Sequence, residues 1–269
     1  MSDLRPIGIF DSGFGGLTAV KEVIRSLPDE QIVYFGDTAR VPYGPKSRET
    51  VVRFSIENIL FLLKCKVKLI IIACNTASSV ALSIVEESFK VPIIGVIAPG
   101  VLEAVNVTKN KKIGVIGTRT AINSGTYEKM IKQKRSGAKV YSTECPLFVP
   151  LVEEGWLNTQ ITKQIARQYL LPLKLKKIDT LVLGCTHYPL LKPVIREVMG
   201  KEVTLVDSAR QVARQAKEIL VKGNLLASGG NKNKNNLRFY VSDEPDNFAA
   251  LGKRFLGFKL ENVRKVSNV

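Results

Sequence analysis

A chain of 269 residues is long enough to form one large α/β domain or two of moderate size. Hydrophobic residues make up 45% of it and charged residues 24%, which is typical of a folded globular protein and excludes a disordered chain. The 40 basic and 24 acidic residues give a formal net charge of +16. This charge is spread over the whole sequence, without the interleaved aromatic residues of a nucleic-acid site. We therefore expect a solvated basic surface and no specific nucleic-acid partner.

The first predicted elements are a strand at residues 6–10, a helix at 17–27 and a second strand at 32–36. Between the first strand and the helix lies the turn DSGFGG, whose glycines allow a tight turn and a close approach to a ligand. Its first residue, Asp11, either caps the helix or holds a carboxylate over a site at the carboxyl end of the strand.

A loop rich in proline and glycine, GDTARVPYGPKS, follows the second strand, and long loops after strands often carry function. Ser47 is expected to cap a helix that ends near residue 66. The next strand is the apolar run before Cys74, and a helix at 76–89 and a short strand at 91–97 complete this series. Pro99 and Gly100 then predict a break in the chain.

Beyond this break the pattern restarts, which indicates an internal duplication. KIGVIGTR at 112–119 echoes PIGIFDSG at 6–13, with an interval of 106 residues from Ile7 to Ile113. The turns LIIIACNTAS and LVLGCTHYPL place Cys74 and Cys185 111 residues apart. We therefore predict two similar facing α/β domains with mostly parallel sheets and a site in the cleft between them. The first is expected to comprise residues 1–97 and 208–269, and the second residues 98–207.

Within the second half we predict helices at 122–135, 159–171, 188–199 and 208–222, and strands at 139–145, before Cys185 and at 204–207. A turn is expected to lead into FVPLVEEGW, residues 148–156, and a polar connecting loop is expected at 223–236. The last strand, at 237–242, and the last helix, at 245–256, have no counterpart in the repeat, so we expect them to return to the first half.

Several kinds of protein are excluded by other features. No apolar run approaches the roughly 18 residues of a membrane span, and the first residues lack a signal-peptide pattern, so we expect a cytoplasmic protein without a membrane partner. The cysteines, Cys65, Cys74, Cys145 and Cys185, show neither CxxC pairs nor metal-ligand spacing. Neither a metal site nor a disulfide scaffold is therefore predicted.

Cys74 and Cys185 are the candidate catalytic residues. Each follows a buried strand and precedes a helix, where backbone N–H groups and the helix dipole favour a thiolate. One cysteine in such a place is usually packed for its volume, but two copies, each with a threonine nearby, favour a site. Two acid/base groups on opposite faces of one carbon suit racemisation or epimerisation. A redox dithiol needs adjacent cysteines, and a cysteine hydrolase has no role for the second one.

The neighbours of the two cysteines fit this chemistry. Donors suited to a substrate carboxylate are Ser12, Asn75, Thr76 and Thr186. His187, the only histidine of the chain, can orient Cys185, exchange a proton with it, or serve a structural role. Asp11 and Glu153 are the acidic candidates, one in each half. Because turnover requires one thiolate and one thiol, we expect a bell-shaped dependence of the rate on pH.

Seven motifs occur in order along nearly the whole chain. They are DSGFGGL from Asp11, GDTARVPYG from Gly36, ACNTAS from Ala73, GVIAPG from Gly95, CPLFVPLVEEG from Cys145, LGCTHYPLL around Gly184 and VDSA from Val206. In this order they resemble the cofactor-independent glutamate racemases of the aspartate/glutamate racemase superfamily. The resemblance implies an isomerase that interconverts L- and D-glutamate without a cofactor and supplies D-glutamate for peptidoglycan synthesis, and thereby for cell-wall biogenesis and cell shape. It also implies a homodimer.

By this resemblance, Cys74 acts on the D enantiomer with the help of Asp11, and Cys185 acts on the L enantiomer with the help of Glu153 and His187. The substrate contacts that carry over are Asp11, Ser12, Tyr43, Gly44, Asn75, Thr76, Thr186 and His187. The segment GTRTAINS departs from the family pattern, because Ala121 stands where members often carry threonine and Thr120 comes one place earlier. Thr118 is therefore the better candidate for the contact from this loop.

Two alternatives remain open at this stage. A sister racemase acting on aspartate or another amino acid would differ only in side-chain length and distal contacts, and the motifs GDTARVPYG and CTHYPLL favour glutamate. A basic nucleic-acid-binding protein is the alternative from another class, and it would show a sequence preference that survives at physiological salt.

Overall fold

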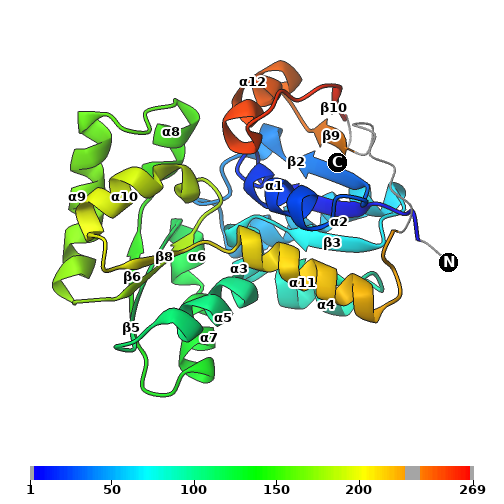
Figure 1. Ribbon diagram of the computed structural model, residues 1–269. Coiled ribbons are helices and arrows are strands. Elements are labelled where there is room, and N and C mark those ends of the chain that lie inside the picture. Colours follow the sequence, from blue (N-terminus) through cyan, green and yellow to red (C-terminus); the bar gives the residue numbers. More distant parts are fainter. Residues whose placement is uncertain (1–2, 228–236, 267–269) are drawn as a thin grey trace.

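The computed structural model describes residues 3–227 and 237–266, and it shows two α/β parts side by side (Figure 1). The first part contains β1 (Ile7–Asp11), α1 (Leu17–Ser26), β2 (Ile32–Gly36), the short 3-10 helix η1 (Thr38–Arg40), α2 (Arg48–Lys64), β3 (Leu69–Ile72), α3 (Asn75–Val80), α4 (Leu82–Ser88) and β4 (Ile93–Gly95). The second part contains α5 (Ile97–Val107), β5 (Lys112–Gly117), α6 (Arg119–Asn123), α7 (Thr126–Lys134), β6 (Lys139–Glu144), α8 (Phe148–Glu153), α9 (Gln160–Leu175), β7 (Thr180–Gly184), the 3-10 helix η2 (Tyr188–Leu191), α10 (Lys192–Met199) and β8 (Thr204–Val206). The chain then returns to the first part with α11 (Ala209–Lys222), β9 (Leu237–Val241), α12 (Pro245–Leu256) and β10 (Val263–Lys265).

Both parts are built on sheets of parallel strands. The strand order is β10-β9-β2-β1-β3-β4 in the first sheet and β6-β5-β7-β8 in the second. The series β2-β1-β3-β4 thus recurs as β6-β5-β7-β8, with β1 equivalent to β5 and β3 equivalent to β7. The predicted duplication into two similar α/β units is confirmed.

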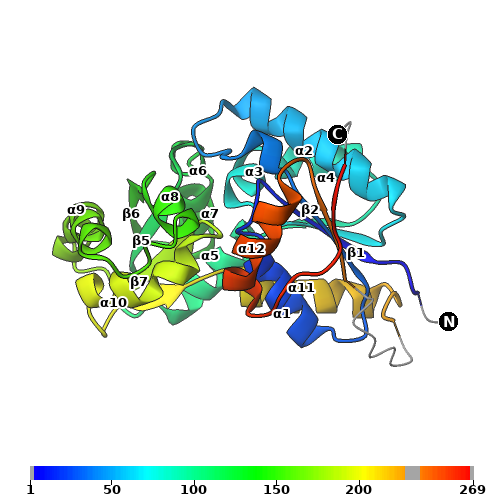
Figure 2. The same ribbon diagram turned by 90° about the horizontal axis from the view of Figure 1, so that it is seen from above.

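The first sheet is covered by helices on both faces, which explains why its strands are almost continuously apolar. Alternate side chains of a strand point to opposite faces, so Ile7 and Ile9 pack in a core with α1, α11 and α12, whereas Phe10 packs in a core with α2. Seen from above, α1 and α11 lie on one side of the strands and α2 and α4 on the other (Figure 2). At the carboxyl end of β3, α3 begins and packs against α6 of the second part.

The C-terminal segment returns to the first sheet. β9 pairs with β2 in a register that runs from Leu237 opposite Ile32 to Val241 opposite Gly36. β10 then pairs with β9; the sequence did not predict it, because its three residues carry two exposed charges and no apolar alternation. The first sheet therefore takes its strands from residues 7–95 and 237–265, and the second from residues 112–206. The domain limits after residues 97 and 207 stay a prediction.

The predicted break at Pro99 and Gly100 is wrong, because α5 runs through both residues. Pro99 is the third residue of this helix, where the missing N–H has no partner within the helix and is tolerated. The predicted turn into FVPLVEEGW is confirmed at Pro146 and Leu147, and the first six residues of that segment form α8. In both places proline stands in the first turn of a helix, where it does not stop the helix.

Two long predicted helices are each divided in the structure. The predicted helix at 76–89 consists of α3 and α4, which meet at Ala81. The predicted helix at 122–135 consists of α6 and α7, separated by Gly125 with a φ of 66°. Only glycine adopts this left-handed conformation at no steric cost.

None of the described helices is both long and apolar enough to cross a membrane. Of the predicted polar loop at 223–236, residues 228–236 lie outside the described residues.

Candidate active site

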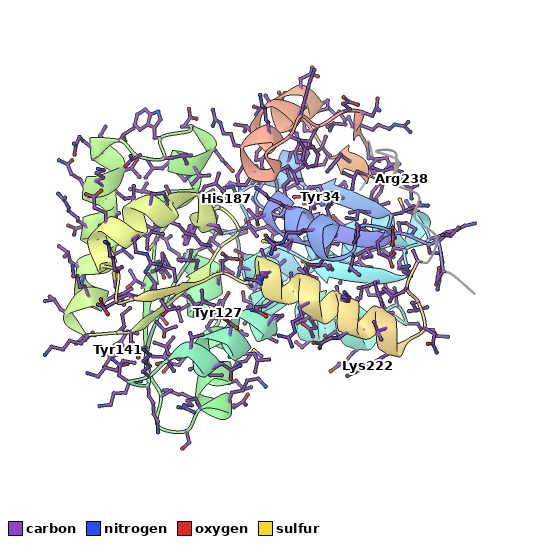
Figure 3. The ribbon with its side chains drawn as sticks, in the orientation of Figure 1. Tyr34, Tyr127, Tyr141, His187, Lys222 and Arg238 are labelled. Carbon is purple, nitrogen blue, oxygen red and sulfur yellow. The ribbon has the colours of Figure 1, made fainter. Side chains whose placement is uncertain are left out.

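Three strand ends bring the catalytic candidates to the junction of the two parts. Asp11 is the last residue of β1, Cys74 lies two residues after β3, and Cys185 directly follows β7. Parallel strands end at the same edge of a sheet, so the side chains after β1 and β3 are neighbours. Figure 3 shows His187 and Tyr127 at the junction, where this edge meets the second part.

The Cys74 thiol is buried at the N-terminus of α3. Its Sγ accepts a hydrogen bond from the Ala77 N–H at 3.5 Å and donates one to Ser12 Oγ at 3.7 Å. Burial and, to a smaller extent, the negative charge of Asp11 raise the pKa of Cys74 to about 12, although the contacts with Ala77 and Ser12 lower it somewhat. Cys74 is therefore a thiol at neutral pH and holds a proton that it can donate.

Cys185 lies at the other side of the junction, next to His187 and Glu153. Its Sγ is 3.8 Å from His187 Nδ1, and His187 Nε2 is 3.0 Å from Glu153 Oε1. Burial alone would lower the pKa of His187, but the contacts with Cys185 and Glu153 outweigh burial and raise this pKa to about 10. The surroundings of the two sulfurs therefore differ, because Cys74 lies near the Asp11 carboxyl group and Cys185 lies beside the His187 ring.

Asp11 connects the two parts. Its side chain is fully buried, Oδ2 accepts a hydrogen bond from the Gly13 N–H at 3.0 Å, and Oδ1 accepts one from the Thr186 hydroxyl at 3.4 Å. Burial raises the pKa of Asp11, and the charge of His187 and these hydrogen bonds oppose the rise. The carboxyl group thus lies between the Cys74 side and the Cys185 side.

Polar side chains from both parts meet at the junction. The Thr76 and Thr118 hydroxyls, from α3 and the turn before α6, are 2.8 Å apart. Asn75 Nδ2 donates to the Tyr127 hydroxyl at 2.7 Å. Tyr127, on α7, is buried and was missed by the sequence analysis; its only signal was a tyrosine on an apolar helix face, whose hydroxyl needs a buried partner.

Tyr43 and Gly44 lie in the loop before α2, and they face different surroundings. The Tyr43 hydroxyl donates to Asp37 and accepts from Asn58 Nδ2 at 3.0 Å, so it points into the first part and away from the cysteines. Any contact of Tyr43 with a substrate must therefore come from its backbone. Gly44 packs against Thr118, where an added Cβ would lie 2.9 Å from the Thr118 Cβ.

The loop around Ala121 holds the two parts together. The Thr120 hydroxyl donates to the carbonyl groups of Gly44 and Lys46 at 2.9 and 2.8 Å, so it is engaged by the first part. Thr118 Oγ1 accepts the Ala121 N–H at 3.4 Å and faces Thr76. This geometry supports Thr118 over Thr120 as the residue of this loop that can contact a substrate.

The C-terminal helix α12 reaches the Glu153–His187 pair from the first part. The Phe255 ring packs edge-on against His187, with centroids 5.6 Å apart and an interplanar angle of 84°. Arg254 Nη1 donates to the Glu153 carbonyl oxygen at 2.9 Å. The sequence analysis predicted the return of this helix but not these contacts, because they depend on how the two parts face each other.

Phe255→Ala should lower kcat by about 10-fold, because the His187 ring loses the surface that fixes its orientation. Burial predicts a cost of about 3–5 kcal/mol in the free energy of unfolding. Leu256→Ala is the matched control, since Leu256 is the next residue of α12 and equally buried. Steady-state kinetics below the melting temperature of both variants should show the loss in kcat for Phe255→Ala alone. An equal loss in the control would mean that only stability is affected.

The space left between the two parts is small. A cavity of about 10 Å³ beside Cys185, lined among others by Asn75, Thr186 and Ser208, has room for about one water molecule. Within the described ranges, no group of three or more His, Cys, Asp or Glu side chains is arranged to hold a metal ion.

Comparison with known proteins agrees with this arrangement over most of the chain. The model of the Asp/Glu/hydantoin racemase family matches residues 15–216. Glutamate racemase of Geobacter metallireducens is 51% identical over 263 residues, which cover 98% of this chain and 97% of that protein. The structure of glutamate racemase from Francisella tularensis in complex with D-glutamate is 42% identical, has a TM-score of 0.92, and the match covers 98% of each chain.

A more distant structure shares the fold alone. An aspartate racemase homologue from Pyrococcus horikoshii is 19% identical over 81% of this chain and 99% of its own, with a TM-score of 0.56. One assignment agrees with the two duplicated parallel sheets, the cysteines at equivalent strand ends and the family match from residue 15 to residue 216. This chain belongs to the Asp/Glu/hydantoin racemase family.

Proposed function

We propose that the protein interconverts L- and D-glutamate by a two-base mechanism with Cys74 and Cys185, without pyridoxal phosphate or a metal ion. The observation that carries the proposal is the position of the two cysteines at the ends of the equivalent strands β3 and β7, on facing halves of a duplicated fold. Glutamate is favoured over aspartate because the relative named glutamate racemase is 51% identical, whereas the aspartate racemase homologue is 19% identical.

In the L-to-D direction, the Cys185 thiolate takes the Cα proton of L-glutamate and becomes a thiol. The electron pair of the broken C–H bond stays on Cα and is delocalised into the α-carboxylate. The Cys74 thiol then gives its proton to the opposite face of Cα and becomes a thiolate. One proton is taken and one is returned, so the reaction needs no other reagent. The D-to-L direction uses the same steps in reverse.

The neighbouring residues supply what this mechanism needs. His187, held by Glu153, stabilises the Cys185 thiolate and can exchange a proton with it. Asp11 lies near Cys74 and can assist its return to the thiol form. Hydrogen-bond donors for the two substrate carboxylates are Ser12, Asn75, Thr76, Thr118 and Thr186, with the backbone of Tyr43 and Gly44 at the distal end.

The raised pKa values predict how stability depends on pH. The pKa of His187 is raised from 6.5 to about 10, so its contribution to stability is complete below pH 6.5 and is lost as the pH rises through 10. We expect the melting temperature of the wild type to fall more steeply between pH 6.5 and pH 10 than that of His187→Gln, which lacks this titration. Parallel curves for the two proteins would contradict a charged His187 in the folded state.

The function itself is tested by incubating the purified protein, after removal of any bound pyridoxal phosphate, with L-glutamate or L-aspartate in deuterium oxide. Loss of optical rotation together with loss of the Cα proton signal for glutamate alone is the expected result. Activity on aspartate instead would move the assignment to a sister racemase. If neither substrate changes under reducing conditions, the proposed reaction is wrong.

A role in supplying D-glutamate for peptidoglycan, a cytoplasmic location and a homodimer belong to this proposal. The role predicts that the gene restores growth of a bacterium that requires external D-glutamate, and that a variant without Cys74 does not. Sedimentation analysis of the purified protein tests the homodimer.

A further inference from the structure

Basic residues gather at the end of the second part that is remote from the catalytic residues. The segments 109–112, 132–139 and 174–179 carry ten lysine and arginine residues and one acidic residue, Asp179. They lead into β5, β6 and β7, so they lie at the amino ends of these strands, whereas Cys185 follows the carboxyl end of β7. The lysines at this end contact none of the residues assigned to glutamate, and the proposed function does not explain their clustering.

Contacts between the segments join them into one surface. The Lys139 N–H donates to the Lys111 carbonyl at 2.8 Å, and Asn110 Nδ2 donates to the Lys177 carbonyl at 2.9 Å. Lys176 Nζ lies 5.8 Å from the centre of the Tyr141 ring, which Figure 3 shows far from His187. We call this surface the basic face and define it by five exposed residues: Lys109, Lys111, Lys139, Lys176 and Lys177.

Asp179 is the one acidic residue of these segments, and it is partly buried. Its carboxylate accepts hydrogen bonds from the Lys109 and Asn110 N–H groups, at 2.7 and 2.6 Å, and from the Thr108 hydroxyl at 2.7 Å. The same hydrogen bonds fix the backbone of the loop that carries Lys109 and Lys111. The carboxylate therefore holds the lysines in place while their charged ends stay in solvent.

Two exposed leucines adjoin the basic face at the end of α9. Leu171 is 46% exposed and Leu175 is 80% exposed. They are four residues apart, so they lie on the same side of the helix, and Leu175 stands directly between Lys174 and Lys176. A large aliphatic side chain that is four-fifths exposed and surrounded by lysines is suited to a partner that is both anionic and apolar.

We propose that the basic face docks the protein on an anionic phospholipid surface, with the lysines on the headgroups and Leu171 and Leu175 inserted at the level of the acyl chains. Clusters of lysine beside exposed aliphatic side chains bind such surfaces through both attractions. This contact needs no spanning segment, but it departs from the expectation from the sequence that the protein has no membrane partner.

Other occupants fit less well. A nucleic acid would offer phosphates but nothing for the two leucines, and nine of the ten basic residues are lysines, which lack the planar fork that arginine uses to read bases. A second copy of this chain on the same face would bring like charges together. In the docked orientation, the junction that holds Cys74 and Cys185 lies away from the membrane, so bound protein can keep its activity.

The proposal is tested by cosedimentation of the full chain with vesicles of phosphatidylcholine alone and of equal parts phosphatidylcholine and phosphatidylglycerol. We expect binding to the anionic vesicles only, and weaker binding as salt is raised. The triple variant Lys109→Gln/Lys139→Gln/Lys176→Gln should lose about 10- to 100-fold in affinity. Leu171→Ser/Leu175→Ser should also bind more weakly but should keep the dependence on salt.

The matched control is Lys64→Gln/Lys90→Gln/Lys222→Gln, which removes the same charge from exposed lysines of the first part. Figure 3 shows Lys222 at the opposite end of the molecule from Tyr141. All variants should racemise at the wild-type rate, which shows that they are folded. The proposal is overturned if the control loses as much affinity or if neutral vesicles bind equally well. It is also overturned if duplex DNA binds more tightly than anionic vesicles, or if the leucine variant changes self-association of the free protein.

Discussion

Cys74→Ala and Cys185→Ala are each expected to lower the rate of racemisation by at least about 10²- to 10⁴-fold, the contribution typical of a single acid/base group. Each sulfur serves one face of Cα, and the structure offers no second thiol there: Cys145 is fully buried in the second part, with its Sγ directed to the Thr143 carbonyl. Stability should change little, because Cys→Ala removes one atom from a buried side chain. Polarimetry with both enantiomers measures the loss.

The two variants should also differ from each other. Cys74→Ala keeps Cys185 and should still exchange the Cα proton of L-glutamate with deuterium oxide slowly, with retention of configuration. Cys185→Ala should do the same with D-glutamate only. Cys145→Ala is the control, with the same atom removed from another buried cysteine, and it should racemise normally. If either active-site variant keeps most of its turnover, the two-base assignment is wrong.

The difference between the two sulfurs must appear in particular rate constants. L- and D-glutamate have the same free energy, so kcat/KM has to be equal in the two directions at every pH. The raised pKa of Cys74 and the charged His187 beside Cys185 make the two directions unlike. This asymmetry can change kcat and KM between the directions, but kcat/KM stays the same in both. Measurement of kcat alone in the two directions is the sensitive test of this asymmetry.

The fold could be predicted from the sequence largely because local signals agree with the tertiary structure. Apolar runs such as the one before Cys74 are strands buried on both faces, and the repeat shows that two such sheets exist. The helix divisions at Ala81 and Gly125 were missed because no proline marks them. The helix through Pro99 was missed because a proline in the first turn looks like a break.

The site could be predicted only where a strand end identifies it. Asp11 ends a strand of a parallel sheet, and Cys74 and Cys185 follow such strands, so their positions were predictable. Tyr127 and Phe255 come from helices that meet the site because the two parts face each other, and a single sequence does not contain this orientation. The direction of the Tyr43 hydroxyl could not be predicted either, since a loop residue can contact a ligand through its backbone or through its side chain.

The distribution of charge shows the same limit. Along the sequence the basic residues are spread over the whole chain, because helices and strands separate the three segments of the basic face. In the structure the turns before β5, β6 and β7 come together at one edge of the sheet, and their lysines with them. Basic residues that are far apart in the sequence are therefore clustered on the surface of the folded protein.

Gly15→Ala is expected to lower kcat by about 100-fold, although Gly15 belongs to the first part and the damage falls on the second. A Cβ at Gly15 would lie 2.2 Å from Thr186 Oγ1 and 2.6 Å from His187 Nδ1, far inside van der Waals contact. Either Thr186 and His187 move or the two parts separate, and a displacement of about 1 Å at a catalytic group typically costs this much.

The matched control is Gly223→Ala, where an added Cβ would meet the flexible Leu225 side chain at 3.1 Å, at the exposed end of α11. It should leave kcat unchanged. Because the clash falls on His187, Gly15→Ala should lose the Cα exchange of L-glutamate, which depends on Cys185, more than that of D-glutamate, which depends on Cys74. Wild-type kcat in Gly15→Ala would show that the DSGFGG turn and the Cys185 turn do not come this close during turnover, and the coupling of the two halves through Asp11 and Thr186 would then have to be abandoned.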